Sequence, residues 1–184
     1  MTFKIVQVGH PVLRQQARAL SIAEIQSPSI RDLIGLMRDT MREAPGVGLA
    51  APQIGLPLQL AMIEDREDLL QGIDPAVLAE RERRPVPFQV IINPTITLDG
   101  PEVEFFEGCL SVAGFSAIVP RARRVRVECL DHNAEPVVIE ASGWHARILQ
   151  HEIDHLQGTL YIDRMQARSL TTMENLGRYR LGSR

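Results

Sequence analysis

The stretch "RILQHEIDHLQG", residues 147–158, carries two histidines four positions apart, with a glutamate directly after the first. From Ser142, a suitable N-cap, to Gly158, a suitable glycine just past a helix end, the chain contains no proline. These start and stop signals predict one α-helix across the whole segment. The fold depends on what this helix packs against, and the function depends on what its histidines bind.

Two stripes of residues emerge along this helix at about 100° per residue. Trp144, Ile148, His151 and His155 share one face. A second face is apolar and consists of Ala146, Leu149, Ile153 and Leu156. A helix that is apolar on two stripes is usually buried, so the two histidines are predicted to lie inside the protein.

Histidines at positions i and i+4 of a helix have Cβ atoms roughly 5–6 Å apart, which lets both imidazoles reach one ion. Buried histidines can also be plain hydrogen-bonded core residues, but Glu152 favours the metal site. The H-E-x-x-H pattern on a helix supplies two nitrogen ligands and a carboxylate next to the water that metal-assisted hydrolysis uses. We therefore predict His151 and His155 as ligands and Glu152 as a catalytic base.

A catalytic site of this kind needs a third protein ligand and an open position. Tyr161 stands where the pattern HExxHxxGxxH has its third histidine, which argues against that peptidase class. Glu174 lies on a predicted C-terminal helix at a distance typical of gluzincin peptidases. Cys109 follows Gly108, which interrupts a strand pattern and favours a bulge just before the thiol. The residues alone leave Cys109 and Glu174 as competing third ligands.

Chain length, apolar content and net charge restrict the class of protein. The chain has 184 residues, 45% of them apolar, and a formal charge of −3 with both signs interspersed. This composition supports one globular domain over residues 1–184 and gives no basis for a nucleic-acid or membrane partner. Two cysteines in a chain of this length are no disulfide framework. The amino terminus "MTFKIVQVGHPVLRQ" has no signal-peptide pattern, so a cytoplasmic location is expected.

The remaining pattern indicates an α+β fold, with mostly antiparallel sheets packed around the central metal-binding helix and helices near the N-terminus. "PVLRQQARAL" begins with Pro11 and "PSIRDLIGLMRDTMREA" follows a capping Ser27, so both are predicted to be helical. Residues 64–85 are highly charged and are expected to form a surface excursion. Five short segments are predicted strands: "LQLAMIE", "FQVIINPTITL", "VEFFEG", "VRVECLD" and "PVVIEA".

The glycine-rich segment "GVGLAAPQIG", residues 46–55, matches the G-x-G-x-x-A pattern of dinucleotide-binding loops. Its context excludes that function, because it follows an amphipathic helix and Pro52 obstructs the helix that would receive the pyrophosphate. What remains is a tight loop of tiny residues that lets a ligand approach the backbone closely. Gln53 adds one side-chain amide that can donate a hydrogen bond.

Three segments in this order, "GVGLAAPQIG", "EGCLS" and "QHEIDHLQG", resemble the three signature motifs of peptide deformylases. The segment "VGHPVLR" near the start also resembles the corresponding part of these enzymes, so the resemblance covers nearly the whole chain. "SVAGFSAIVPR" and "ASGWHARILQHEIDHLQG" resemble the subgroup that includes organellar deformylases. The resemblance implies an enzyme that removes the N-formyl group from the methionine of newly made polypeptides and releases formate.

The resemblance also implies the ligand set. Cys109, His151 and His155 would bind one divalent ion, in this family Fe(2+), with Zn(2+), Ni(2+) or Co(2+) able to occupy the same site. Glu152 would take a proton from the attacking water and return it to the leaving nitrogen. The backbone N–H of Leu110 and the side-chain amide of Gln53 would stabilise the charge that develops on the formyl oxygen.

The peptide would bind through the backbone of Gly48, with its methionine side chain in an apolar pocket. The predicted walls of this pocket are Val47, Ile148 and Trp144. Ala113, Phe115 and Ser116 depart from the bacterial pattern, in which proline and an arginine that faces substrate are common. Peptide contacts beyond the methionine therefore do not carry over. An ion pair between Arg121 and Asp154 would steady the ligands, while two unpaired surface residues are an equal alternative.

The partner is an N-formylmethionyl nascent peptide; some bacterial relatives also dock a longer C-terminal helix on the ribosome, which leaves a transient ribosome association open. A gluzincin-type metallopeptidase would use Glu174 as its third ligand. A catalytically silent metal-binding module would keep the ligands but would not need Glu152.

Overall fold

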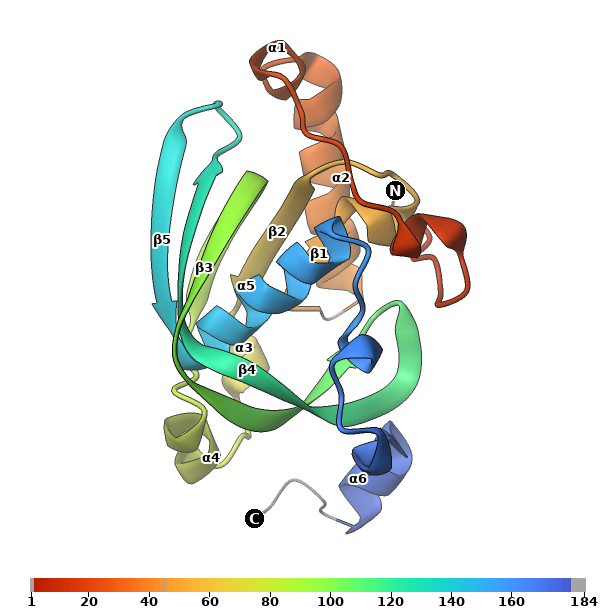
Figure 1. Ribbon diagram of the computed structural model, residues 1–184, viewed down its shortest axis with the longest axis vertical. Coiled ribbons are helices and arrows are strands. Elements are labelled where there is room, and N and C mark those ends of the chain that lie inside the picture. Colours follow the sequence, from red (N-terminus) through yellow and green to blue (C-terminus); the bar gives the residue numbers. More distant parts are fainter. Residues whose placement is uncertain (1, 45, 180–184) are drawn as a thin grey trace.

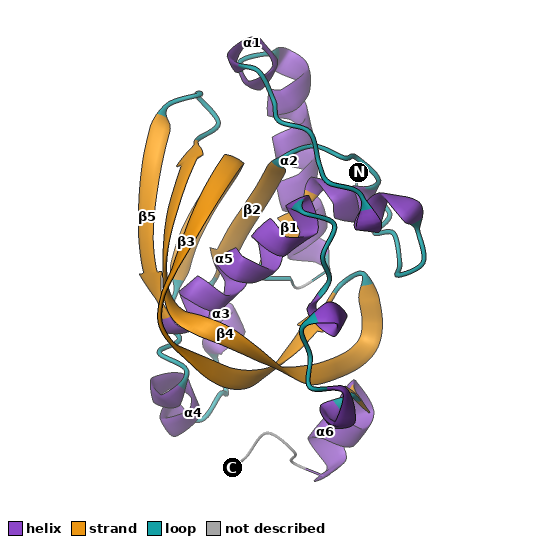
Figure 2. Ribbon diagram, in the orientation of Figure 1, coloured by secondary structure: helices purple, strands orange, loops and turns teal. Residues whose placement is uncertain are grey.

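The structure is a computed structural model that describes residues 2–44 and 46–179 (Figures 1 and 2). Its helices and single 3₁₀ turns are η1 (Pro11–Arg14), α1 (Ile22–Ile25), α2 (Pro28–Glu43), η2 (Ala51–Ile54), α3 (Glu67–Leu70), α4 (Pro75–Glu80), α5 (Gly143–Leu156), η3 (Tyr161–Asp163), η4 (Ala167–Ser169) and α6 (Met173–Tyr179). Its strands are β1 (Gly48–Ala50), β2 (Leu60–Asp65), β3 (Val86–Cys109), β4 (Val112–Leu130), β5 (Pro136–Ser142) and β6 (Thr171–Thr172).

The strands form a sheet in the order β1-β2-β3-β4-β5, with the short β6 added to β4. Every one of these strand pairs is antiparallel. Helix α5 crosses the concave side of the sheet, while α1 and α2 lie at one end of the molecule and α6 at the other (Figure 1). The predicted α+β class, with antiparallel strands around one central helix, is confirmed.

The long hairpin of β3 and β4 gives the sheet its shape. The sequence predicted two strands where the structure has the single strand β3, and it missed the first half of β4. Gly100 and Pro101 lie between the two predicted segments, where Gly100 takes a φ of +79° and the pairing resumes at Glu102 after a register shift. Such an irregularity bends a strand pair. The outer half of the hairpin therefore curves across α5 (Figure 1).

Helix α5 lies in the core, as its two stripes predicted. Ala146 and Leu149 are fully buried, and they pack with β-strand residues such as Ile91 and Val127. Gly158 ends the helix with a φ of +73°, and a Cβ there would lie 2.8 Å from the backbone of Arg14. The C′ glycine is thus required both by its dihedral and by close packing.

The N-terminus of α5 is capped differently from the prediction. Ser142 occupies the N-cap position, but its side chain makes no capping hydrogen bond. Instead, the backbone N–H of Trp144 donates to the carbonyl of Arg81 at 2.9 Å. The loop that precedes β3 therefore binds the start of the metal-site helix.

The N-terminal part of the chain is partly as predicted. Helix α2 begins at Pro28, its N-cap Ser27 accepts a hydrogen bond from Ile30, and Met37 and Met41 are fully buried. The helix predicted over "PVLRQQARAL" is wrong beyond the turn η1, because the chain continues in extended form. Ala17 donates to the carbonyl of Leu156 there, so the segment pairs with the end of α5 instead of with itself.

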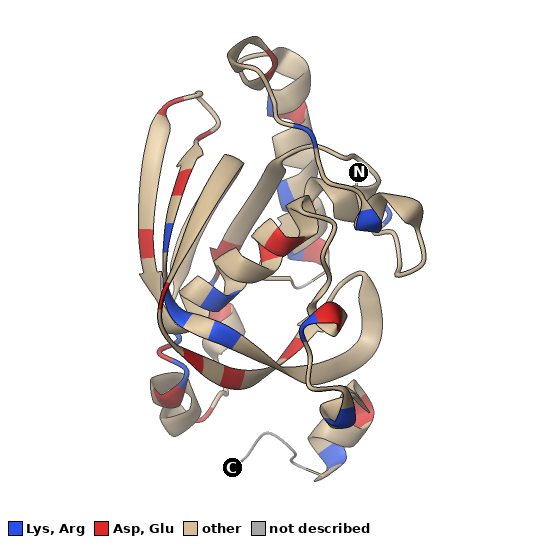
Figure 3. Cartoon of the chain, viewed as in Figure 1, with Lys and Arg blue, Asp and Glu red and all other residues tan. Residues whose placement is uncertain are grey.

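Residues 64–85 form the expected surface excursion, and neither α3 nor α4 contains a buried residue. Its two ends are joined by Arg83, which donates to the buried carboxylate of Asp65 at 2.8 and 2.9 Å. Acidic and basic residues are interspersed over the rest of the chain (Figure 3). Among the described residues, no helix has the length and apolar character that a membrane span needs.

Candidate metal centre

Three side chains from two distant elements meet beside α5. Cys109 ends β3, while His151 and His155 lie on α5, and their ligand atoms are all within 4.8 Å of one another. The Cys109 Sγ is 3.3 Å from Nε2 of His155. Glu174 is not part of this cluster: its side chain is 76% exposed and pairs with Arg178. The gluzincin-type alternative is therefore wrong, and Cys109 takes the third position.

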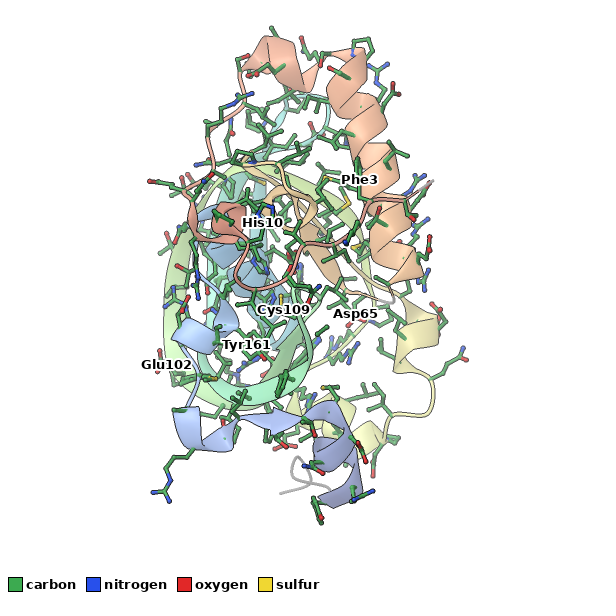
Figure 4. The ribbon with its side chains drawn as sticks, turned by 90° about the vertical axis from the view of Figure 1, so that its right-hand side faces the viewer. Phe3, His10, Asp65, Glu102, Cys109 and Tyr161 are labelled. Carbon is green, nitrogen blue, oxygen red and sulfur yellow. The ribbon has the colours of Figure 1, made fainter. Side chains whose placement is uncertain are left out.

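The position of Cys109 follows from an irregularity in its strand. The β3–β4 register shifts between Gly108 and Cys109, as the glycine before the thiol predicted. The backbone N–H of Ser111 then donates to Sγ at 3.4 Å, and the side-chain amide of Gln53 donates to it at 3.5 Å. Both donors suit a thiolate, the form of cysteine that binds metal. Cys109 lies inside the fold, with Tyr161 nearby (Figure 4).

Glu107 orients the first histidine. Its carboxylate lies 3.1 Å from Nδ1 of His151, which leaves Nε2 free to face an ion. Arg121 donates to both oxygens of Glu107 at 3.0 Å, and Arg147 adds a bond of 2.7 Å. Burial alone would raise the pKa of Glu107, but hydrogen bonds from His151 and Arg121 hold this pKa well below its ordinary value. The carboxylate is therefore ionised and holds the ring in one orientation.

The two histidines differ in their protonation. Burial lowers the pKa of His155 well below its ordinary value, so its imidazole is neutral and able to bind metal. Burial acts on His151 as well, but hydrogen bonds to Cys109 and Glu107 raise its pKa well above the ordinary value. Metal binding at such a ring proceeds with release of its proton.

The ion pair between Arg121 and Asp154 exists, with a distance of 2.6 Å. Both side chains are less than 10% exposed, which rules out the alternative of two surface residues. Arg164 completes the arrangement with two bonds to Asp154, at 2.7 and 2.8 Å. Residues on β3, β4, α5 and the following loop are thus linked by charge-assisted hydrogen bonds directly behind the cluster.

Glu152 is 4% exposed and faces the backbone of β1. A Cβ built on Gly48 would lie 2.2 Å from Oε1 of Glu152, so any larger residue at this position would displace the Glu152 side chain. Burial raises the pKa of Glu152 to about 7, close to the value that suits a general base at neutral pH. Its Oε2 is buried without a hydrogen-bond partner among the described residues. A carboxylate oxygen in that state is available to a water or to a ligand.

Gln53 is held in one orientation by its own turn. Its Oε1 accepts a hydrogen bond from the N–H of Ala50 at 2.9 Å, which directs Nε2 toward Cys109 and Ser111. The side chain is 1% exposed. The side-chain amide that the sequence analysis singled out in the glycine-rich loop therefore lies at the cluster.

A cavity of about 470 Å³ opens onto the cluster. A volume of this size suits a ligand as large as a short peptide. Its walls include the predicted pocket residues and both predicted contributors of hydrogen bonds to the formyl oxygen: Val47, Gly48, Gln53, Leu110, Trp144, Ile148, His151 and Glu152. Three cationic side chains lie near the Trp144 ring, at 5.0 Å for Arg81, 5.3 Å for Arg83 and 5.9 Å for Arg147.

Sequence reasoning missed two residues that support the centre. Glu107 was quoted within "EGCLS" without a role, although it precedes Cys109 by two positions on the same strand face. Arg147 was overlooked, yet it lies four residues before His151 and so on the same helix face. Its guanidinium also donates to the carbonyls of Val103 and Val119, at 2.6 and 2.8 Å, which explains how a cation is tolerated in the core.

The donor set determines which ions fit. One thiolate and two imidazoles suit borderline metals such as Fe(2+), Zn(2+), Ni(2+) and Co(2+), whereas Mg²⁺ and Ca²⁺ prefer oxygen ligands. Three protein ligands beside an open cavity are typical of a catalytic site, because a structural site is closed by a fourth.

Comparison with known proteins agrees with this geometry. "Peptide deformylase 1A, chloroplastic" of Solanum lycopersicum is 47% identical over 94% of this chain, and "Peptide deformylase, mitochondrial" of Homo sapiens is 45% identical over 92%. The chain spans 62% and 70% of the length of these two relatives. The crystal structure of a class I type b peptide deformylase from Acinetobacter baumannii, bound to Met-Ala-Ser, superposes with a TM-score of 0.79 at 30% identity; the match covers 90% of this chain and 99% of that one.

The organellar resemblance seen in the sequence is thus confirmed by organellar relatives. The family model for polypeptide deformylase matches residues 2–170, and on this ground the chain belongs to the polypeptide deformylase family.

Proposed function

We propose that this protein hydrolyses the N-formyl group from the N-terminal methionine of newly made polypeptides and releases formate. The observation that carries the proposal is the free Oε2 of the buried Glu152, which follows His151 on α5 and lines the same cavity as His151 and Cys109. A base, a ligand set and a peptide-sized cavity are the three parts that metal-assisted amide hydrolysis requires.

Cys109, His151 and His155 would hold one Fe(2+), and Zn(2+), Ni(2+) or Co(2+) could occupy the same ligands. When bound, the ion supplies Lewis-acid chemistry: it polarises a carbonyl oxygen and lowers the pKa of water. Glu107 and Arg147 keep the first histidine in place, and the link from Arg121 to Asp154 fixes the helix behind it.

Glu152 moves the protons. It accepts one proton from the attacking water, whose oxygen forms a bond to the formyl carbon. The carbon–nitrogen bond then breaks, and Glu152 returns the proton to the leaving nitrogen of methionine. The balance is one water and one formyl amide consumed, with formate and a protonated amine produced, the second proton of the water passing from the formic acid to the amine.

Two donors stabilise the charge on the formyl oxygen during this step. The Nε2 of Gln53 lies beside Cys109. Leu110 is the next residue after Cys109 and lines the same cavity, so its backbone N–H would be the second donor. One donor of this kind is worth roughly 3–4 kcal/mol in a transition state. Because Ala50 already fixes the amide of Gln53, little reorganisation is needed when the charge develops.

The peptide itself would bind along β1 and α5. Gly48 offers its backbone to the substrate, while Val47, Ile148 and Trp144 enclose the methionine side chain. An apolar pocket of this type favours an apolar side chain such as methionine through the hydrophobic effect.

One domain over residues 1–184 accounts for the activity, with an N-formylmethionyl nascent peptide as substrate and a transient ribosome association open to test. The cytoplasmic location expected from the sequence stays a prediction, since relatives of this chain are named as chloroplastic and mitochondrial.

Formate release from formyl-Met-Ala-Ser tests the proposal, with protein purified anaerobically and loaded with Fe(2+). The parent should release formate, and Cys109→Ala should lose both the bound ion and turnover. A parent that holds one ion per chain but releases no formate from this peptide would overturn the proposed function.

A further inference from the structure

A short segment before β3 binds one of the proposed walls of the methionine pocket. Residues 81–83, here called the strap, lie between α4 and β3. The carbonyl of Arg81 accepts the backbone N–H of Trp144 at 2.9 Å, so the strap lies at the end of the molecule where α5 begins (Figure 1). Trp144 lines the cavity beside the metal cluster. The strap is therefore attached to the pocket, although the proposed mechanism gives it no part.

The strap and the start of α5 are packed backbone against backbone. A Cβ built on Gly143 would lie 2.4 Å from Cβ of Glu82 and 2.7 Å from the carbonyl oxygen of Arg81. Glu82 itself has a φ of +48°, which residues other than glycine rarely adopt. Such a conformation persists where the surrounding structure fixes it. The position of the strap therefore determines where α5 places Trp144.

Arg83 anchors the strap to a second wall of the pocket. Its guanidinium donates to both oxygens of Asp65, at 2.8 and 2.9 Å, and Asp65 is buried at the end of β2 (Figure 4). A bidentate pair of this kind holds its two partners in one geometry. Glu64, the residue before Asp65, donates its backbone N–H to the carbonyl of Val47 at 2.9 Å. Val47 and Trp144, two proposed walls of the pocket, are thus connected through Arg83.

The ring of Trp144 has no polar anchor of its own. Its indole N–H is buried and has no hydrogen-bond partner among the described residues. The ring instead meets the edge of Phe105, with 6.5 Å between the centroids, and the guanidinium groups of Arg81 and Arg83 at 5.0 and 5.3 Å. Both distances from the guanidinium groups are within the range of cation–π attraction. The strap therefore holds the ring of this wall as well as its backbone.

We propose that the strap sets the width of the methionine pocket, with Arg83 as the positioning residue that ties it to Asp65. This inference rests on the proposed function, because it concerns the pocket of that substrate. Arg83 acts through Trp144, whose fixed ring excludes a side chain wider than that of methionine. A wall that can move would admit the wider side chain and would bind methionine less tightly.

A merely structural ion pair would behave differently. Loss of such a pair lowers the free energy of unfolding, but it leaves the choice between two ligand side chains as it was in the parent. The ratio of two affinities therefore separates a positioning role of Arg83 from a structural one.

Binding of unformylated tripeptides tests the strap without any turnover. Calorimetry measures the affinities of Met-Ala-Ser and Phe-Ala-Ser for the Zn(2+)-loaded parent and for Arg83→Met. The matched control is Arg84→Met, the same change at the exposed neighbouring residue. Arg83→Met leaves the buried carboxylate of Asp65 unpaired, so the double variant Asp65→Asn, Arg83→Gln, which has no buried charge at this place, decides the test if Arg83→Met does not fold. Trp144 is the only tryptophan of the chain, so quenching of its fluorescence by acrylamide reports how well the ring is held in the ligand-free protein.

The parent should prefer Met-Ala-Ser to Phe-Ala-Ser, and Arg83→Met should reduce this preference about five- to tenfold. Quenching of Trp144 should increase in the same variant, while Arg84→Met keeps the parental ratio and quenching. With formyl-Met-Ala-Ser, Arg83→Met should raise KM and leave kcat near the parental value, because the wall contacts the substrate and the transition state equally.

Two results would overturn the role of the strap: equal affinities of the parent for the two peptides, or a parental ratio in the folded variant, even if that variant is less stable. Formate release by the parent is measured separately. Its absence would refute the proposed function, whereas the binding ratio and the quenching of Trp144 would still report on the strap.

Discussion

Replacement of Gly48 by alanine should abolish most activity while it leaves the metal site intact. The new Cβ would lie 2.2 Å from Oε1 of Glu152, and 2.5 and 2.7 Å from its Cδ and Cγ. Ordinary contact begins near 3.4 Å, so the carboxylate must retreat by about 1.2 Å. The three contacted atoms belong to the far end of a flexible side chain, and the side chain will move instead of the backbone of β1.

A misplacement of about 1 Å in a catalytic group can cost on the order of 10²-fold in rate. We therefore expect kcat/KM for formyl-Met-Ala-Ser to fall about 100-fold in Gly48→Ala, with one ion per chain retained. The matched control is Gly35→Ala within α2, where a Cβ meets nothing within 4 Å. That variant should keep the parental rate and gain roughly 0.5–1 kcal/mol of stability.

Formate release, metal analysis and urea unfolding of both variants decide this prediction. Parental activity in Gly48→Ala would refute the reasoning, because it would mean that the position of Glu152 does not matter to the reaction. Loss of the ion together with activity would also contradict it, since the three atoms nearest to the new methyl group all belong to Glu152 and not to a ligand.

Three further predictions concern the buried charges behind the centre and the second cysteine. Glu107→Gln should weaken metal affinity about 10- to 100-fold in chelator competition, because the ring of His151 loses its anionic partner. In metal-free protein, the free energy of unfolding of this variant should also fall less steeply with decreasing pH than that of the parent. The sign follows from the lowered pKa of Glu107: its contribution to stability is present above the ordinary value near 4.5 and is lost as the pH falls toward the lower folded value, which urea unfolding across pH will measure. Arg121→Met should lower the free energy of unfolding in urea by about 3–5 kcal/mol, because two buried carboxylates lose a partner. The control Arg123→Met, on the exposed sheet face, should lower it by under about 0.5 kcal/mol. Equal losses in the two variants would contradict the buried network. Burial raises the pKa of the Cys129 thiol, so iodoacetamide at pH 8 should modify it much more slowly in the folded protein than in urea, as followed by peptide mass spectrometry; equal rates would contradict its burial.

The positions of His151, Glu152 and His155 relative to one another could be predicted from the sequence because all three lie on one helix. The spacing of His151, Glu152 and His155 fixes their relative positions wherever the helix lies. The apolar stripes then placed that helix in the core, and the two ends of α5 agree with the predicted signals to within a residue.

The third ligand could not be settled from the residues themselves, since it depends on a contact between distant segments. Cys109 reaches α5 only because the β3–β4 hairpin bends at Gly100 and shifts register again at Gly108. Neither irregularity has a local signal strong enough to set the path of a long hairpin. Glu174 remained a rival for the same reason, and the resemblance to a known family, not periodicity, favoured Cys109.

The buried ion pairs were the least predictable feature. Arg147 looks like an ordinary surface residue of a helix, yet it is 3% exposed and bonds to Glu107 and two backbone carbonyls. Burial of a cation becomes favourable only when its partners are in place, and those partners come from strands that the sequence placed only approximately. The same holds for Gly48, whose close approach to Glu152 exists only in the folded chain.

The most direct test of the account compares two quantities in one preparation of Glu152→Gln loaded anaerobically with Fe(2+): the ions bound per chain and the rate of formate release from formyl-Met-Ala-Ser. The amide keeps the size of the side chain but cannot accept a proton. We predict one ion per chain, as in the parent, with formate release reduced by at least about 10²-fold. Parental rates in this variant would contradict the role of Glu152 as the base, and loss of the ion would contradict a centre held by Cys109, His151 and His155 alone.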